Sequence, residues 1–457
     1  MALLTRPRRS SLRWWVPALL LVVGAAACAA SEGAGDPRTL AVPSQYGTVQ
    51  DAVDAARPGD LVLVSPGVYR EAVLVVTPEV TIRGTDRNTV VLDGRGGLET
   101  GVSVVDTGGV AVENLTVRNY SNSGLTWIDA AGFRASHVTA YDNGRVGIDV
   151  FDSVDGLVEQ VWASGSGEVG LRITQCDPCQ IVVDGLTAVD NGTGVLLTNA
   201  GRELQVVRST VRSNRAGIVL HSTGFSLCGP QQGATVAGNL VGPNDRRDLL
   251  IGEVGIVADN SGIAVVGGRD NDVRSNRVTG QPAFGIVVAP YPELEAASPL
   301  PEESEVVEPC RTRAFLPSSG RIAVTTWPAT GNRLTANVVV GSGVADLAVG
   351  AVADEASASG NCASGNLAAV TRPTDLQALA PCGSAPTATD WGDGAYVVPD
   401  LERRERKQLL RVGDDVEPRR GPVPPPQPQL PGAATAPVVP ATTPPVPVDV
   451  DTLVTPG

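Results

Sequence analysis

The stretch Gly147-Ile148-Asp149-Val150-Phe151 is followed 23 residues later by Gly170-Leu171-Arg172-Ile173-Thr174, and this step decides the fold. A glycine followed by an apolar residue recurs at this spacing, with one step of 24. The six copies begin at Gly101, Gly124, Gly147, Gly170, Gly194 and Gly217. A fixed period of this length is typical of a solenoid, in which each repeat leaves an apolar face that a stacked neighbour covers.

Side chains alternate in character after each of these glycines. Ile148 and Val150 are apolar, whereas Asp149 and Phe151 differ in type from their equivalents in other copies. A period of two indicates β-strands, with the first pair pointing into the coil and the second pair outward. A second alternating segment follows in each repeat. Two or three short strands per repeat predict an all-β parallel β-helix.

The segment before the repeats predicts a capping helix. Thr48 is a good N-cap residue, and an apolar stripe follows at Val49, Ala52 and Val53 until Pro58 ends the pattern. An uncapped solenoid end exposes apolar surface and unpaired strand edges. We therefore expect this short helix to cover the first coil.

Two insertions interrupt the later repeats. The period resumes at Gly262 and Gly285 after a gap of 45 residues from Gly217, and residues 290–320 lack any alternation. The outward positions become apolar in this region, at Leu196, Val219, Ala264 and Val287. We expect the two inserted loops to cover that apolar face, which leaves the earlier coils open.

The start of the repeat region contains three motifs, Gly67-Val68-Tyr69-Arg70-Glu71, Thr81-Ile82-Arg83-Gly84 and Leu92-Asp93-Gly94. They resemble the opening of right-handed parallel β-helix proteins of the pectin-lyase-like superfamily. The resemblance covers roughly residues 38–370, and the glycine-led repeats (PbH1 repeats) are most similar to the NosD-like branch of periplasmic and secreted proteins. It implies a right-handed coil but specifies activity poorly.

The N-terminal residues predict export. Basic residues precede an apolar run from Trp14 to Ala27, which is short for a transmembrane helix. Gly24-Ala25-Ala26-Ala27-Cys28 resembles a bacterial lipoprotein box, with Ala25 where leucine is usual. The chain has seven cysteines, so lipidation of Cys28 would leave six for pairing. Cleavage after Ala27 with Cys28 left free is the alternative.

Composition changes along the chain divide it into five segments. We predict a signal peptide over 1–28, a linker over 29–38, the β-helix over 39–385, a charged linker over 386–412 and a disordered proline-rich tail over 413–457. The tail has too little apolar bulk to form a core and is expected to act as a spacer.

Charge and cysteine content indicate the environment of the protein. A net charge of −14 argues against nucleic acid and against an anionic membrane surface as partners, so membrane contact is expected through the lipid anchor only. Six cysteines suggest an oxidising compartment. Their proximity in sequence proposes the pairs Cys176–Cys179, Cys228–Cys310 and Cys362–Cys382. Cys176 and Cys179 have an alternative interpretation as a redox pair or as half of a zinc site.

The register of the repeats selects one polar cluster. Asp129 and Asp152 each follow a main strand at the same position in successive coils, which lie about 4.8 Å apart. Carboxylates at that spacing repel each other, so they need a cation, a proton or backbone donors. Asp149 stacks on Arg172 of the next coil, beside Phe151 and Thr174.

This cluster has two interpretations. In the functional one, Asp129, Asp149 and Asp152 hold calcium or supply the acid, with Asp129 and Asp152 as the candidate calcium ligands. Arg172 binds a uronate or acts as a base, and Phe151 and Thr174 contact sugar. The resemblance suggests it, because lyases of the superfamily use acidic calcium ligands and an arginine base. In the structural one, strand-end residues stabilise turns and Asp149–Arg172 is an ordinary ion pair.

The familiar catalytic motifs of the superfamily are absent. Neither the segments of pectin methylesterases nor the Asp-Pro-His-Asp motif of mannuronan C5-epimerases occurs, and His137 and His221 are the only histidines. Two hypotheses follow. The first is an envelope-anchored, glycan-recognising or accessory β-helix without an assembled catalytic motif; the second is a lyase or hydrolase acting on an acidic polysaccharide.

Overall fold

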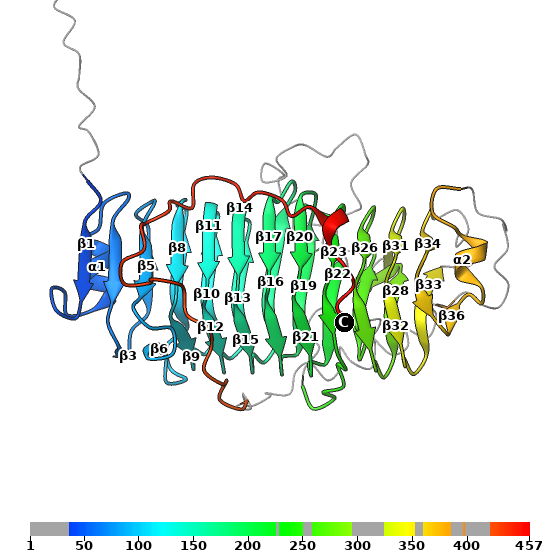
Figure 1. The fold of residues 1–457 in the computed structure, drawn as a ribbon, viewed down its shortest axis with the longest axis horizontal. Coiled ribbons are helices and arrows are strands. Elements are labelled where there is room, and N and C mark those ends of the chain that lie inside the picture. The colour runs from blue at the N-terminus through cyan, green and yellow to red at the C-terminus, as the bar shows by residue number, and fades with distance from the viewer. Residues whose placement is uncertain are drawn as a thin grey trace, which may run out of the picture. The chain divides into compact units, whose positions relative to one another are not determined.

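Short parallel strands repeat along the chain and stack into three long sheets (Figure 1). The computed structural model describes residues 36–224, 228–249, 258–294, 324–351, 360–384, 396–397 and 421–457. The predicted signal peptide, Cys28, Cys310 and most of the charged linker lie outside these ranges.

Each coil contributes one strand to each sheet, and neighbouring coils pair in parallel. Sheet A comprises β1 (Thr39–Val42), β2 (Leu61–Val64), β5 (Thr81–Gly84), β8 (Val110–Glu113), β11 (Ala131–Ser136), β14 (Val154–Glu159), β17 (Ile181–Asp184), β20 (Leu204–Val207), β23 (Thr235–Ala237), β26 (Asp272–Arg274), β31 (Arg333–Thr335) and β34 (Cys362–Ser364). Sheet B comprises β3 (Gly67–Tyr69), β6 (Val90–Asp93), β9 (Thr116–Arg118), β12 (Thr139–Tyr141), β15 (Trp162–Ser164), β18 (Thr187–Val189), β21 (Thr210–Arg212), β24 (Leu240–Val241), β27 (Arg277–Thr279), β32 (Val338–Val340) and β35 (Leu367–Ala368).

Sheet C contains the strands that follow the repeated glycines. It comprises β4 (Val73–Val75), β7 (Thr100–Val105), β10 (Ser123–Ile128), β13 (Val146–Phe151), β16 (Val169–Cys176), β19 (Thr193–Ala200), β22 (Ala216–His221), β25 (Ile263–Val266), β28 (Phe284–Ala289), β33 (Ala345–Ala351) and β36 (Thr371–Arg372), with β37 (Tyr396–Val397) also pairing with β33. Leu125, Ile148 and Leu171 are direct register partners in successive strands. The 23-residue step therefore equals one coil, as predicted.

The apolar positions of the repeats form a continuous core between the three sheets. Ile148, Leu171 and Ile218 are fully buried there, together with their equivalents in the other coils. Burying such a side chain stabilises the fold by about 1.5 to 3 kcal/mol. Because each coil buries its apolar face only against the next, the stacking itself creates the core.

Helices cover the two ends of the coil stack. The predicted N-terminal helix is α1 (Val49–Asp54), and its N-cap Thr48 accepts a hydrogen bond from the Asp51 amide. Val49, Ala52 and Val53 are buried against the first coils. At the other end, α2 (Leu376–Leu379) contacts β33 and β34. No sequence pattern predicted this second cap.

Amide side chains run through the turns as ladders. The backbone N–H of Asn191 donates to Asn214 Oδ1 (2.9 Å), and the backbone N–H of Asn214 donates to Asn244 Oδ1 (3.2 Å). Asn143 lies in the same row of turns two coils before Asn191, and Ser166 takes the position between them, where its backbone amide donates to Asn191 Oδ1. Two further ladders pass through the turns of the later coils. Each ladder satisfies buried backbone donors at a coil corner.

The proline-rich C-terminus differs from the prediction. Residues 421–457, which we call the strap, lie along the coils and form hydrogen bonds with Arg87, Arg134, Gln205 and Arg277 (Figure 1). The strap ends with the short 3₁₀ helix η8 (Val450–Thr452). The expectation of a tail that does not pack is therefore wrong for these residues. A proline-rich chain cannot build a core, but it can lie against donors that the coils supply.

Candidate functional site

The predicted Asp149–Arg172 contact exists on the outer face of sheet C. The two residues are direct register partners in β13 and β16. The guanidinium binds both carboxylate oxygens, with Nε donating to Oδ1 at 2.9 Å and Nη2 to Oδ2 at 2.6 Å. The pair lies on the outer face of the sheet but is largely buried, because the side chains of Arg172 and Asp149 are only 18% and 9% exposed. This is a bidentate ion pair between coils.

Asp129 and Asp152 lie in the turns that follow β10 and β13. Both have left-handed backbones, with φ of 51° and 47°. Asp106, Gln175 and Asn199 adopt the same conformation at equivalent positions. Aspartate and asparagine tolerate this conformation better than most residues, which gives a local reason for their recurrence. The turn interpretation therefore has direct structural support.

The structure does not favour calcium binding at these aspartates. Calcium takes six to eight oxygen ligands, commonly from several carboxylates. Both oxygens of Asp149 are bound by Arg172, so Asp129 and Asp152 would supply the remaining carboxylates alone. No group of three or more His, Cys, Asp or Glu side chains is placed to hold a metal within the described ranges. The predicted ligands do not fit calcium, and we derive no chemistry from that ion.

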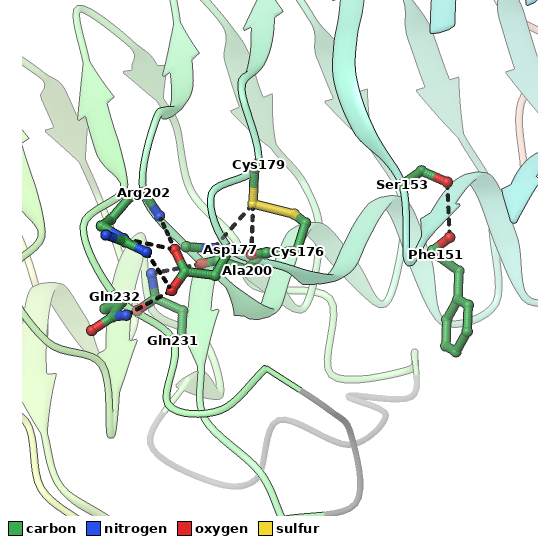
Figure 2. The surroundings of a disulfide bond; sticks show 10 residues. Phe151, Ser153, Cys176, Asp177, Cys179, Ala200, Arg202, Gln231 and Gln232 are labelled. Atoms are coloured by element: carbon green, nitrogen blue, oxygen red, sulfur yellow. Dashed lines mark hydrogen bonds and ion pairs between the residues drawn. A yellow bond between two sulfur atoms is a disulfide. The ribbon is translucent and has the colours of Figure 1, made fainter. Parts of the chain in front are cut away.

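Two apolar side chains remain exposed beside the ion pair. Ile128 and Phe151 are register partners at the ends of β10 and β13, and each is 37% exposed. Thr174, the next residue in this row, is buried. Figure 2 shows the phenyl ring of Phe151. The backbone carbonyl of Phe151 accepts a hydrogen bond from the Ser153 hydroxyl (2.9 Å). An exposed aromatic ring thus lies next to a guanidinium and a carboxylate.

The outer face of sheet C becomes covered from Leu196 onward. Leu196, Val219 and Val287 belong to a second apolar cluster that also contains Tyr291 and Trp327. The last two come from an antiparallel hairpin of β29 (Tyr291–Leu294) and β30 (Val324–Trp327), within the second insertion. The predicted covering of the later coils is therefore present. Cys228 is disulfide-bonded, while Cys310, its predicted partner, lies outside the described residues.

His221 lies inside this covered region. Its ring contacts Tyr291 edge-on, with the ring centroids 4.6 Å apart. Burial lowers the pKa of His221 to about 3, because the charged form loses its hydration. Neither ring nitrogen has a hydrogen-bond partner among the described residues. His221 is therefore neutral at physiological pH. His137 is half-buried, and its Nδ1 atom forms a hydrogen bond with the Ser136 hydroxyl (2.9 Å).

The Cys176–Cys179 disulfide closes the turn after β16 (Figure 2). Both sulfur-bearing residues are buried, and the intervening Asp177 receives hydrogen bonds from Arg202 and Gln232. Such a crowded, inaccessible turn favours a structural role over a redox or zinc function. The third predicted pair, Cys362–Cys382, is also present.

A buried charged group lies on another face of the coils, at positions that were not among the predicted site residues. Glu113 lies on the outer face of sheet A and accepts hydrogen bonds from Arg83 Nε (2.7 Å) and Arg134 Nε (2.8 Å). Arg83 and Glu113 are register partners, so opposite charges at one position of adjacent coils were a readable signal. The contact of the strap with these residues could not be predicted, because the composition of the strap does not indicate which surface it packs against.

A second overlooked cluster lines a depression between sheet B and the strap. The depression measures about 430 Å³ and is bounded by Arg118, Tyr141 and Gly421 among others. Arg118 pairs with Asp93 (3.0 Å) and donates to the Tyr141 hydroxyl (2.6 Å). Asp93, Arg118 and Tyr141 thus form one connected polar group on the wall of this depression.

Comparison with known proteins supports the fold. The family model described as a right handed beta helix region matches residues 80–278. Together with the three parallel sheets, this match shows that the protein folds as a right-handed parallel β-helix. The NosD-like assignment stays a prediction. A search of curated proteins found no match.

Several solved structures share the β-helix at low sequence identity. The A-module of a mannuronan C-5 epimerase from Azotobacter vinelandii is 15% identical, with a TM-score of 0.44, over 70% of this chain and 94% of that one. A periplasmic alginate epimerase is 11% identical over 73% and 83%, with a TM-score of 0.38. An alginate lyase from a Paenibacillus species is 13% identical over 55% and 91%, with a TM-score of 0.33. The epimerase and lyase activities are those of the compared proteins.

Proposed function

We propose that this protein binds an acidic polysaccharide along the open part of sheet C without cleaving it. The observation that carries the proposal is the contrast along this face. The hairpin covers the apolar positions from Leu196 onward, whereas Ile128 and Phe151 stay exposed beside Asp149 and Arg172. Uncovered large apolar side chains grouped with charged ones are typical of a binding surface.

The chemistry of this face suits a charged sugar. An aromatic ring packs against the apolar face of a pyranose, and a guanidinium binds a carboxylate through paired hydrogen bonds. Successive strands lie about 4.8 Å apart, so a polymer crossing them meets equivalent positions at each coil. The Asp149 carboxylate orients the Arg172 guanidinium by accepting hydrogen bonds from its Nε and Nη2 atoms.

The same geometry argues against catalysis by the predicted groups. A guanidinium keeps its proton in proteins, and Arg172 uses Nε and Nη2 to bind Asp149. It therefore cannot serve readily as a base, and both Asp149 oxygens are engaged by one cation. The alternative of a lyase or hydrolase using Asp129, Asp149, Asp152 and Arg172 predicts product formation, which the binding experiment detects.

The first prediction concerns polysaccharide affinity. The protein should be retained by polyuronates but not by neutral polysaccharides, and Phe151→Ala and Arg172→Gln should each weaken binding about tenfold by removing the ring or the cation. Affinity electrophoresis with and without calcium measures retention, and an assay for new reducing or unsaturated ends measures cleavage.

The matched control is Arg208→Gln, because Arg208 forms a similar ion pair between coils with Asp184 away from sheet C. Equal loss of affinity in Arg208→Gln would place the ligand elsewhere. Product formation by the wild type, abolished in Asp149→Ala, would replace the binding function with the enzymatic one.

We also propose that the chain is exported and anchored at the outer face of the membrane through Cys28. The basic, apolar N-terminus and the lipoprotein-like segment support this. In the described residues, no helix is long and apolar enough to cross a membrane. Cys28→Ala should move the protein from the membrane fraction to the soluble exported fraction, as measured by immunoblotting. An unchanged distribution, or a wild type that is already soluble, contradicts anchoring.

A further inference from the structure

The strap crosses the outer face of sheet A as an extended chain (Figure 1). It has 37 residues, of which 12 are proline, and its only charged residues are Asp449 and Asp451. Proline lacks a backbone N–H, so a chain of this composition presents many carbonyl acceptors and few donors. A surface that binds it must therefore supply donors.

Sheet A and its turns supply those donors through arginine. Arg83 donates to the carbonyls of Ala436 (2.7 Å) and Pro437 (3.2 Å), and Arg134 donates to the carbonyl of Val439 (2.6 Å). Nearer the start of the strap, Arg87, in the turn after β5, donates to the carbonyl of Pro428 (3.0 Å). Near the end of the strap, Arg277, in β27 of the neighbouring sheet B, donates to the carbonyl of Pro456 (2.5 Å). Donors thus meet the strap near its start, at its middle and at its end.

Two amide side chains bind the strap backbone in both directions. Asn88 donates to the carbonyl of Gln427 (3.0 Å) and accepts from its amide (2.8 Å). Gln205 does the same with Val448, at 3.0 and 2.7 Å. An amide side chain that pairs with both the N–H and the carbonyl of one residue recognises the extended backbone of a peptide. Such recognition does not depend on the side chain of the bound residue. This resembles the way in which sheet edges and grooves bind peptides in trans.

The coil surface also leaves room for the strap. A Cβ atom on Gly132 would lie 2.3 Å from the Ala441 carbonyl oxygen, and one on Gly109 would lie 2.7 Å from the Thr442 side chain. Both glycines have positive φ, of 80° and 72°. Ala433 and Ala441 of the strap are nearly buried. The fit is therefore steric as well as polar.

We propose that the outer face of sheet A is a binding track for an extended, proline-rich peptide, filled by residues 421–457 of its own chain and open to the same segment of a second copy. The described contacts between strap and track are noncovalent. The 23 residues between Val397 and Gly421 can span at most about 80 Å, so the strap of one copy can reach the track of another. The partner is thus a second copy of this chain, in an exchange of identical segments.

The experiment uses folded, full-length protein that carries a protease site between Arg419 and Arg420. After cleavage, the strap is expected to stay bound through gel filtration, and a fluorescent peptide of residues 421–457 should bind saturably as the cut strap exchanges out. Uncut protein should take up the peptide at least about tenfold more weakly, because its tethered strap competes at a high effective concentration.

Two variants and their control locate the interaction. Asn88→Ala and Gln205→Ala should each weaken peptide binding about tenfold, since each loses two backbone hydrogen bonds. Gln50→Ala, whose side chain contacts Leu74 and Asp54, should leave it unchanged. Loss of the strap on cleavage with no peptide binding overturns the proposal. So does equal binding of a scrambled peptide, or displacement of the strap by a polyuronate, which would make a polysaccharide the ligand of this face.

Discussion

Replacing Glu113 by glutamine is expected to destabilise the coils around β8 by about 3 to 5 kcal/mol. Glu113 is 3% exposed and is the carboxylate that binds both Arg83 and Arg134. Glutamine preserves the shape but removes the charge, so the buried Arg83 guanidinium loses its counter-ion. Burial of an unpaired charge is costly, because the lost hydration is not replaced.

Hydrogen exchange measured by mass spectrometry on peptides covering residues 80–136 tests this expectation. A local measurement is preferable, since coils of a solenoid need not unfold in one cooperative step. The matched control is Glu168→Gln. Glu168 pairs with Arg145, whose side chain is 51% exposed, so its removal should change stability by no more than about 1 kcal/mol. Similar losses of protection in the two variants would show that Glu113 does not neutralise a buried charge.

Acidification is expected to destabilise the covered half of sheet C through His221. The unfolded side chain binds a proton below its ordinary pKa of 6.5, whereas burial lowers the folded pKa to about 3. Between these values the unfolded state holds more protons, so stability is lost as the pH falls from 6.5 toward 3. At pH 4.5 the loss amounts to about 3 kcal/mol, or two pH units at roughly 1.4 kcal/mol each.

Melting temperatures at pH 7 and pH 4.5 test this effect. His221→Leu should lose much less stability on acidification than the wild type, because leucine fits the apolar cluster formed with Tyr291 and Trp327 and does not titrate. The control is His137→Leu, which removes the other histidine. Burial also lowers the pKa of His137, but that side chain is only half-buried, so its contribution has the same sign and a smaller size. An unaltered pH dependence in His221→Leu would contradict the assignment.

The sequence was most informative in the repeats, where the same alternation of inward and outward side chains recurs in every coil. Each glycine-led strand places Ile148 and its equivalents inside, because side chains alternate along a strand and the repeat length equals one coil. The register of Asp149 with Arg172, the helix capped by Thr48 and the pairs Cys176–Cys179 and Cys362–Cys382 follow from spacing of this kind.

The candidate site was predicted less completely. Asp149 and Arg172 meet as expected, and both carboxylate oxygens of Asp149 are bound by the Arg172 guanidinium. Asp129 and Asp152 lie at turn positions with a left-handed backbone, a conformation that aspartate tolerates well. In the sequence, aspartates that recur for this reason cannot be told apart from aspartates that recur as metal ligands.

By itself the sequence determined the coil, its register and the face on which Asp149, Phe151 and Arg172 lie, because these depend on contacts between neighbouring repeats. The tertiary structure alone decided which faces remain open. The hairpin with Tyr291 covers one part of sheet C, and the strap covers Arg83 and Glu113 on sheet A. These contacts join residues up to about 350 positions apart in a chain whose strap has no periodic pattern. No local rule relates such segments, and only packing brings them together.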